Sequence, residues 1–124
     1  MYSKQTRGSG RQTRSSSEQA IALSTAAQAQ FRRFDVFADY ANLTAVESWL
    51  ASLETRSGKT QAAYADGMLA LLGYAKAQGL AFEDLKADDI MSFRSSLVES
   101  GKRPSTISVY LAGVRSYYRH CAAA

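Results

Sequence analysis

The chain contains 124 residues, 46% of them hydrophobic, and it carries a formal net charge of +4 at pH 7. This length suits one domain with its own core, and the apolar fraction excludes an intrinsically disordered chain. A single cysteine excludes an internal disulfide, and a single histidine leaves a metal site short of ligands, so we expect neither a metal nor a cofactor.

The region before the first clear helix signal divides into two parts. Residues 1–17 are rich in Ser, Gly, Arg and Gln with almost nothing to bury, which predicts a flexible basic tail. Residues 18–43 contain dispersed apolar side chains, such as Phe31 and Phe34, without a clean period. We expect this second part to be a packed lead-in that is partly helical.

Two helices are expected next, over about 45–55 and about 59–78. The segment Thr44-Ala45-Val46-Glu47 has the form of a capping box, in which the Thr hydroxyl and the Glu carboxylate accept from free backbone amides. Within the second helix, Gly67 and Gly73 should each weaken the helix by up to ~1 kcal/mol relative to Ala. Gly79 is placed to end it.

Two further helices are expected over about 87–99 and about 104–121. Gly101 should end the first of them, and Pro104 suits the first turn of the second, where its missing amide costs nothing. The last helix should bury Ile107, Leu111, Val114 and Tyr118, with Tyr117 at the edge of the stripe. No segment has a strand pattern, so we predict an all-α, compact four-helix bundle over residues 44–121, with room for an additional N-terminal helix. Residues 122–124 are expected to be a C-terminal end outside this bundle.

The last helix also has a polar face opposite its apolar stripe. Ser108, Ala112, Arg115 and Arg119 follow one another at i, i+4, i+7 and i+11, and Lys102, Arg103, Ser105 and Thr106 surround the helix start. A second cluster, Lys59, Thr60 and Gln61, opens the 59–78 helix after Arg56. Cations and hydroxyls at helix starts favour an anion such as a DNA phosphate, but the spacing fits a solvated basic surface equally well.

Two catalytic interpretations of these segments fail on the residues present. Gly58-Lys59-Thr60 resembles the end of a nucleotide-binding P-loop, but that motif requires a glycine five positions before Gly58, where Leu53 stands. A nucleophilic role for Tyr117 or Tyr118 would require cations and a proton donor around the phenol, and we expect Tyr118 to be a core residue instead. We therefore predict no catalytic residues in this chain.

The order of these segments resembles the core-binding domain of tyrosine recombinases, which include the phage integrases. The resemblance spans about residues 44–121. It rests on Thr60-x-x-x-Tyr64, Leu71-Leu72-x-Tyr74, Gly79-Leu80, Leu85-x-x-x-Asp89-Ile90-x-x-Phe93-x-x-x-Leu97, Gly101, and Pro104-Ser105-Thr106-Ile107-x-x-x-Leu111-x-x-Val114-Arg115-Ser116-Tyr117-Tyr118-Arg119.

The resemblance implies a SAM-like helical domain that forms one half of a clamp on the recombination core site. By position it implies DNA contacts from Lys59, Thr60, Gln61, Arg103, Ser105, Thr106, Ser108, Arg115 and Arg119. The catalytic domain, with its nucleophilic tyrosine, would lie beyond residue 124. The chain departs from the family at Ala65 and Asp66, where basic residues are frequent, and at Arg103, where a serine commonly precedes the proline.

The function that follows is DNA binding for integration and recombination by a phage or mobile-element recombinase in the cytoplasm of its host cell. The expected partners are double-stranded DNA and other recombinase protomers, with no membrane and no small-molecule substrate. Two alternatives stay open from the sequence. One is a helical protein-interaction domain, and the other is a free-standing regulatory domain that occupies DNA sites without recombinase activity.

Overall fold

The computed structural model describes residues 23–123, so the predicted tail at 1–17 lies outside the described residues. Within this range the chain is all α-helical and contains no strand, which confirms the predicted fold class. The elements are α2 (Thr25–Arg32), the 3-10 helix η2 (Arg33–Phe37), α3 (Leu43–Ser52), α4 (Gly58–Ala77), the 3-10 helix η3 (Phe82–Asp84), α5 (Ala87–Glu99) and α6 (Pro104–Ala123).

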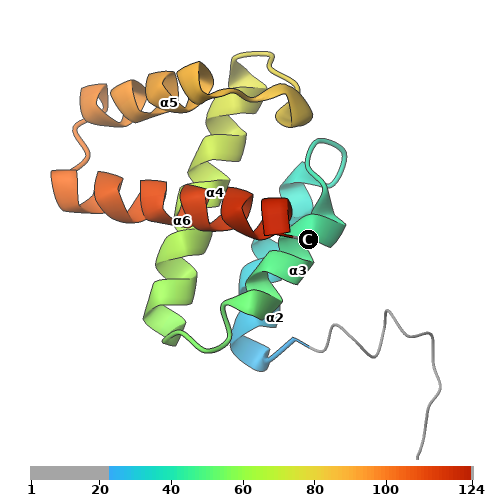
Figure 1. Cartoon of the computed structure of the whole chain (residues 1–124). Coiled ribbons are helices and arrows are strands. Elements are labelled where there is room, and N and C mark those ends of the chain that lie inside the picture. The colour runs from blue at the N-terminus through green and yellow to red at the C-terminus, as the bar shows by residue number, and fades with distance from the viewer. Residues whose placement is uncertain (1–22, 124) are drawn as a thin grey trace, which may run out of the picture.

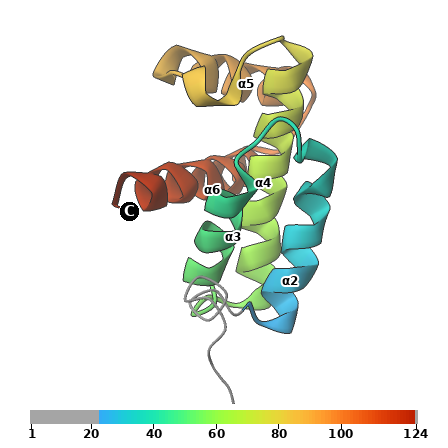
Figure 2. The ribbon, with the colours of Figure 1, turned by 90° about the vertical axis from the view of Figure 1, so that its right-hand side faces the viewer.

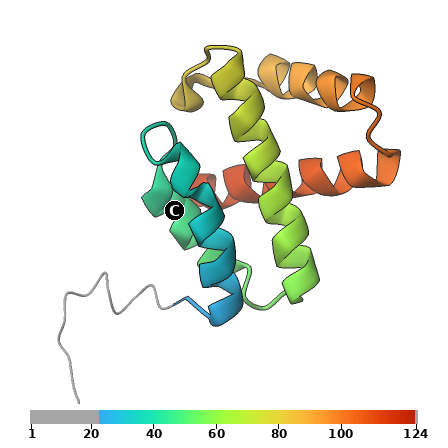
Figure 3. The same ribbon diagram turned by 180° about the vertical axis from the view of Figure 1, so that it is seen from behind.

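The long helix α4 is the centre of the arrangement, and α6 crosses it at a steep angle (Figure 1). Helix α2 lies beside the first half of α4, and α3 packs against α2 and α6 (Figure 2). Helix α5 returns from the far end of α4 and runs alongside α6 in the opposite direction (Figure 1). Seen from behind, α4 covers the middle of α6 and leaves both ends of α6 extending past it (Figure 3).

The crossing of α4 and α6 depends on one glycine from each helix. A Cβ atom built on Gly67 would lie 2.5 Å from the Tyr110 carbonyl oxygen, and one built on Gly113 would lie 2.7 Å from that of Tyr64. No real side chain tolerates such distances to a neighbouring backbone, so the two helices touch main chain to main chain here. The sequence predicted only that Gly67 weakens its helix, whereas the contact with α6 requires a glycine at this position.

An aromatic core joins α6 to α3. The Trp49 ring meets the Tyr117 ring edge-on, with 5.5 Å between centroids, and the indole Nε1 donates to Ser116 Oγ at 3.0 Å. Tyr117 is only 2% exposed, so the sequence-based assignment of Tyr117 to the edge of the stripe was wrong. Tyr118 is half-buried and packs against the core, as expected. Adjacent helical residues point about 100° apart, and the position of Trp49 decides which of the two is the more deeply buried.

The lead-in is part of this same core. Ser24 caps α2 by accepting from the Ala27 amide at 3.1 Å, and both Ala27 and Phe34 are fully buried. The additional N-terminal helix predicted from the sequence is therefore present as α2.

One helix boundary differs from its prediction because two caps compete. Helix α3 begins at Leu43, and its cap is Asn42, whose Oδ1 accepts from the Ala45 amide at 3.1 Å. The predicted start at the Thr44 capping box was wrong, since asparagine is at least as strong a cap and comes two residues earlier. Positive φ angles of 74° and 85° at Gly79 and Gly101 confirm the predicted ends of α4 and α5. Among the described residues, no helix combines the length and the hydropathy needed to cross a bilayer.

Candidate nucleic-acid interface

Three hollows adjoin one another around the first half of α6. The α4–α6 hollow has a volume of about 500 Å³ and is lined by Arg56, Lys59, Thr60, Ala63, Tyr64, Ser108, Val109 and Ala112. The α5–α6 hollow, of about 210 Å³, is lined by Ile90, Met91, Arg94, Leu111, Val114 and Arg115. The Pro104 hollow, also about 210 Å³, is lined by Arg94, Val98, Lys102, Pro104, Ile107, Ser108 and Leu111. The α4–α6 and Pro104 hollows share Ser108, and the Pro104 and α5–α6 hollows share Arg94 and Leu111, so the three form one continuous surface.

The charges on this surface all have one sign. Its cations, which we call the cationic border, are Arg56, Lys59, Arg94, Lys102 and Arg115, and no carboxylate lines any of the three hollows. All five are exposed. Within residues 23–123, none of the five forms an ion pair, and the pairs found are Arg33–Asp66 and Lys76–Asp39. An unneutralised cluster of this kind attracts polyanions.

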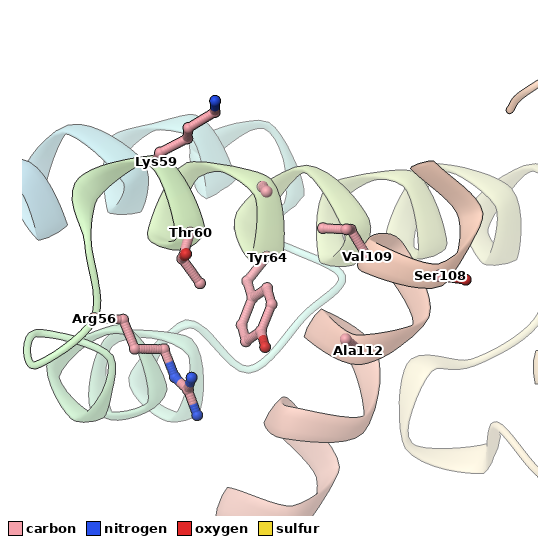
Figure 4. A pocket seen from close by; sticks show the side chains of 8 residues that line it. Arg56, Lys59, Thr60, Tyr64, Ser108, Val109 and Ala112 are labelled. Atoms are coloured by element: carbon pink, nitrogen blue, oxygen red, sulfur yellow. The ribbon is translucent and has the colours of Figure 1, made fainter. Parts of the chain in front are cut away.

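Local contacts in the turn before α4 fix the positions of the residues that α4 contributes to this surface. Ser57 Oγ accepts from the Thr60 amide at 3.1 Å and caps α4. The Arg56 guanidinium carbon lies 5.5 Å from the centre of the Tyr64 ring, a cation–π contact that orients the charge toward the hollow (Figure 4). Across the hollow, α6 presents Val109 and Ala112 (Figure 4).

Gln61 does not belong to this surface. Its side chain is 4% exposed, and its Nε2 donates to the Arg56 carbonyl oxygen at 3.0 Å. The amide therefore fixes the turn that carries Arg56 rather than reaching a ligand. The structure removes Gln61 from the surface residues expected from the sequence, because the close packing of α4 against its neighbours turns this face inward.

The other residues expected at the site separate into two groups. Lys59, Thr60, Ser108 and Arg115 line the hollows. Arg103, Ser105, Thr106 and Arg119 lie on or beside α6 but line none of the three. Arg103 occupies the cap position of α6, where its carbonyl accepts from the Ile107 amide at 3.0 Å, and its side chain is exposed.

Sequence reasoning missed Arg94, which lines two of the three hollows. It is the single basic residue of α5, whose first turn is acidic. That isolated charge beside the buried Phe93 was the available signal, but its meaning depends on α5 lying next to α6. Lys102 was noticed only as part of the α6 start, and it lies 5.9 Å from the Tyr110 ring centre.

The departure from the recombinase pattern at Ala65 and Asp66 has a structural cause. Ala65 is fully buried. Asp66 accepts from Arg33 of η2 at 2.6 Å, so this carboxylate is paired with the lead-in and lies outside the three hollows. Its negative charge is thereby kept apart from the cationic border.

The tyrosines near the end of α6 are packing groups. Burial, followed by the charges of Cys121 and Tyr40, raises the pKa of Tyr118 to about 12. Burial and a hydrogen bond to Cys121 raise the pKa of Tyr117 as well. Both rings pack against Phe82 and against each other at this end of α6. His120, for which the sequence suggested no partner, has its Nε2 2.9 Å from Ser48 Oγ.

The family model described as "Phage integrase, N-terminal SAM-like domain" matches residues 46–124, which include most of α3 and all of α4, α5 and α6. No curated protein and no solved structure matches the chain. Groups of three or more His, Cys, Asp or Glu side chains that could hold a metal ion are absent from the described range.

Proposed function

The chain belongs to the family of phage-integrase N-terminal SAM-like domains, and from that premise we propose that it binds duplex DNA at a recombination core site. In this proposal the domain is one half of a clamp, and a catalytic domain beyond residue 124 cuts the DNA. Other recombinase protomers are its protein partners, in the cytoplasm of the host cell. The domain supplies affinity and register, and it takes no part in the chemistry.

The observation that carries this proposal is the continuous cationic border around the first half of α6. Arg56 and Lys59 lie on its α4 side, and Arg94 lies on its α5 side. Between them the helix presents Ser108, Ala112 and Arg115, which share one outward face. A helix ridge with small side chains and cations on both flanks suits the major groove, where the ridge meets base edges and the flanks meet phosphates.

The test is a titration of a fluorescent DNA duplex with the full chain at several salt concentrations. Each phosphate neutralised contributes about 0.9 to the slope of log affinity against log salt, so the five cations together predict a slope of about −4 to −5. Lys59→Ala and Arg115→Ala should each reduce the magnitude of that slope by about 1. Arg32→Ala, an exposed arginine on α2 that lines none of the hollows, is the matched control and should leave the slope unchanged. Binding without salt dependence, or equal effects of all three substitutions, would contradict the proposal.

A protein-interaction role is the second candidate, and one observation favours it. Met91 and Val98 lie one heptad apart on α5 and are 66% and 52% exposed. Exposed methionine next to arginine is typical of protein interfaces. This alternative predicts that Met91→Ser abolishes binding to a protein partner and that the chain has no salt-dependent affinity for DNA. The free-standing regulatory alternative shares the DNA surface and is distinguished by whether the reading frame continues past Ala124 into a catalytic domain.

A further inference from the structure

The α4–α6 hollow combines a cationic rim with an apolar floor. Ala63 of α4 and Val109 and Ala112 of α6 contribute methyl groups to its lining. Val109 is 38% exposed, so its side chain is available to a ligand that enters the hollow. Figure 4 shows Val109 and Ala112 facing the space beside Tyr64 and Thr60.

The floor exists because of the glycine crossing. Backbone contacts at Gly67–Tyr110 and Gly113–Tyr64 bring α4 and α6 together. Ala63 on α4 directly precedes Tyr64, Val109 on α6 directly precedes Tyr110, and both line the hollow beside these contacts. The hollow thus lies beside the main-chain crossing, and Ala63, Val109 and Ala112 form an apolar part of its lining, which we call the floor, next to the hydroxyls of Thr60 and Ser108.

A phosphate would not occupy this floor. Phosphate oxygens require donors, and methyl groups offer none, so a desolvated oxygen there would lose its hydrogen bonds to water. The donors Arg56 and Lys59 belong to the same lining and suit the DNA backbone beside the floor. An apolar group gains free energy by entering, since it removes both its own surface and that of Val109 from water.

We propose that the floor of the α4–α6 hollow receives the 5-methyl group of a thymine, with Val109 as the specificity-determining residue. The inference rests on the proposed function, in which α6 enters the major groove. The thymine methyl is the apolar group that unmodified DNA presents on that edge. A cytosine at the same place would leave Val109 facing water and an unpaired polar edge, so the hollow discriminates between the two pyrimidines.

The experiment compares two duplexes that differ only in that methyl group. The full chain is titrated with alternating poly(dA-dT) and with alternating poly(dA-dU) of equal length, at one fixed salt concentration. Burial of one methyl group predicts about fourfold weaker binding to the uracil duplex. Val109→Ser should remove most of this preference, because it replaces the apolar floor by a hydroxyl. Val36→Ser is the matched control, since Val36 is an exposed valine on η2 outside the hollow, and it should keep the preference.

The possible outcomes distinguish a failure of the thymine assignment from a failure of the proposed DNA binding. Equal binding of the unaltered chain to both duplexes would overturn the thymine assignment while leaving DNA binding in place. A preference that persists in Val109→Ser would show that it arises from the stiffness of the DNA and would also overturn the assignment. Absence of binding to either duplex would overturn the proposed function itself and this inference with it. Circular dichroism of both variants confirms that the helices are retained.

Discussion

The two halves of α6 have different surroundings although they form one continuous helix. The C-terminal half packs its Tyr117 and Ser116 against Trp49 of α3. The N-terminal half carries Ser108 and Val109 at the surface, between cations of α4 and α5. Gly113 marks the boundary, where α6 crosses α4. The comparison teaches that substitutions of the buried residues after Gly113 should alter stability and that substitutions of the exposed residues before it should alter ligand affinity. Arg115, two residues past Gly113, is exposed and belongs with the binding surface.

The largest effect is expected in the buried half, at Trp49. Trp49→Ala should lower the free energy of unfolding by about 4 kcal/mol, because it leaves a cavity and deprives Ser116 of its donor. Urea unfolding followed by circular dichroism measures the change. Val109→Ala in the exposed half is the control and should cost well under 1 kcal/mol. Similar losses for both variants would contradict the division of α6.

The next effect is expected at the boundary itself. Gly113→Ala places a Cβ against the Tyr64 backbone and should destabilise the fold by about 2 kcal/mol, through displacement of α6 from α4. Gly73→Ala is the matched control on α4, because nothing lies within 4 Å of its added Cβ. Better helix propensity should stabilise that variant by about 0.5–1 kcal/mol. Changes of opposite sign in the free energy of unfolding would confirm that the helix crossing requires Gly113, and changes of the same sign would contradict it.

An intermediate effect, confined to binding, is expected from Arg94. Arg94→Ala should reduce the slope of DNA affinity against salt by about 1 and leave the urea midpoint unchanged, because its exposed guanidinium contributes charge rather than packing. Salt-dependent anisotropy titration measures it. A shift of the urea midpoint without a change in slope would show that Arg94 contributes to stability and not to DNA binding.

Alkaline pH should lower the stability of the fold, because tyrosines with raised pKa values include two in the buried half of α6. Burial raises the pKa of Tyr118 to about 12, and that of Tyr117 is raised too, whereas a tyrosine in the unfolded chain titrates near 10.0. Between these values the unfolded state loses protons that the folded state retains, so stability is fully present below pH 10 and falls as pH rises toward 12. Urea midpoints measured across this window test the sign. A flat profile would contradict the burial of the two phenols.

The smallest effect is expected from Tyr118→Phe. The Tyr118 hydroxyl is buried and has no hydrogen-bond partner among the described residues, so its removal should change the free energy of unfolding by less than about 0.5 kcal/mol or stabilise the fold slightly. Thermal and urea unfolding at neutral pH measure this difference. A loss of more than 1 kcal/mol would show that the hydroxyl has a partner and that this end of α6 is more polar than its packing indicates.

Much of the fold was predictable because its signals are local. Gly79 and Gly101 end helices through backbone conformations that glycine adopts most easily, and Pro104 begins one, so the bounds of α4, α5 and the start of α6 followed from single residues. The start of α3 was mispredicted because Asn42 and Thr44 are both good caps, and local chemistry does not choose between them.

The candidate site was predictable only in part, for a different reason. Lys59, Ser108 and Arg115 were identified because cations and small side chains at helix starts have a recognisable chemistry. Gln61 was misassigned to the surface, since its polarity says nothing about the packing that buries it. Arg94 was missed because its relevance depends on a helix distant in the sequence.

Taken alone, the order of amino acids determined the helical class, most helix ends and the presence of excess positive charge, since each depends on neighbours within a few positions. Tertiary packing decided that Tyr117 is the more deeply buried of the two adjacent tyrosines and that Gly67 and Gly113 must be glycines. It also decided that Arg56 and Arg94 border one surface with α6. The physical reason is that helix periodicity specifies which residues share a face of one helix. Which faces meet is specified only when backbones approach to contact distance, and that distance is set jointly by residues far apart in the chain.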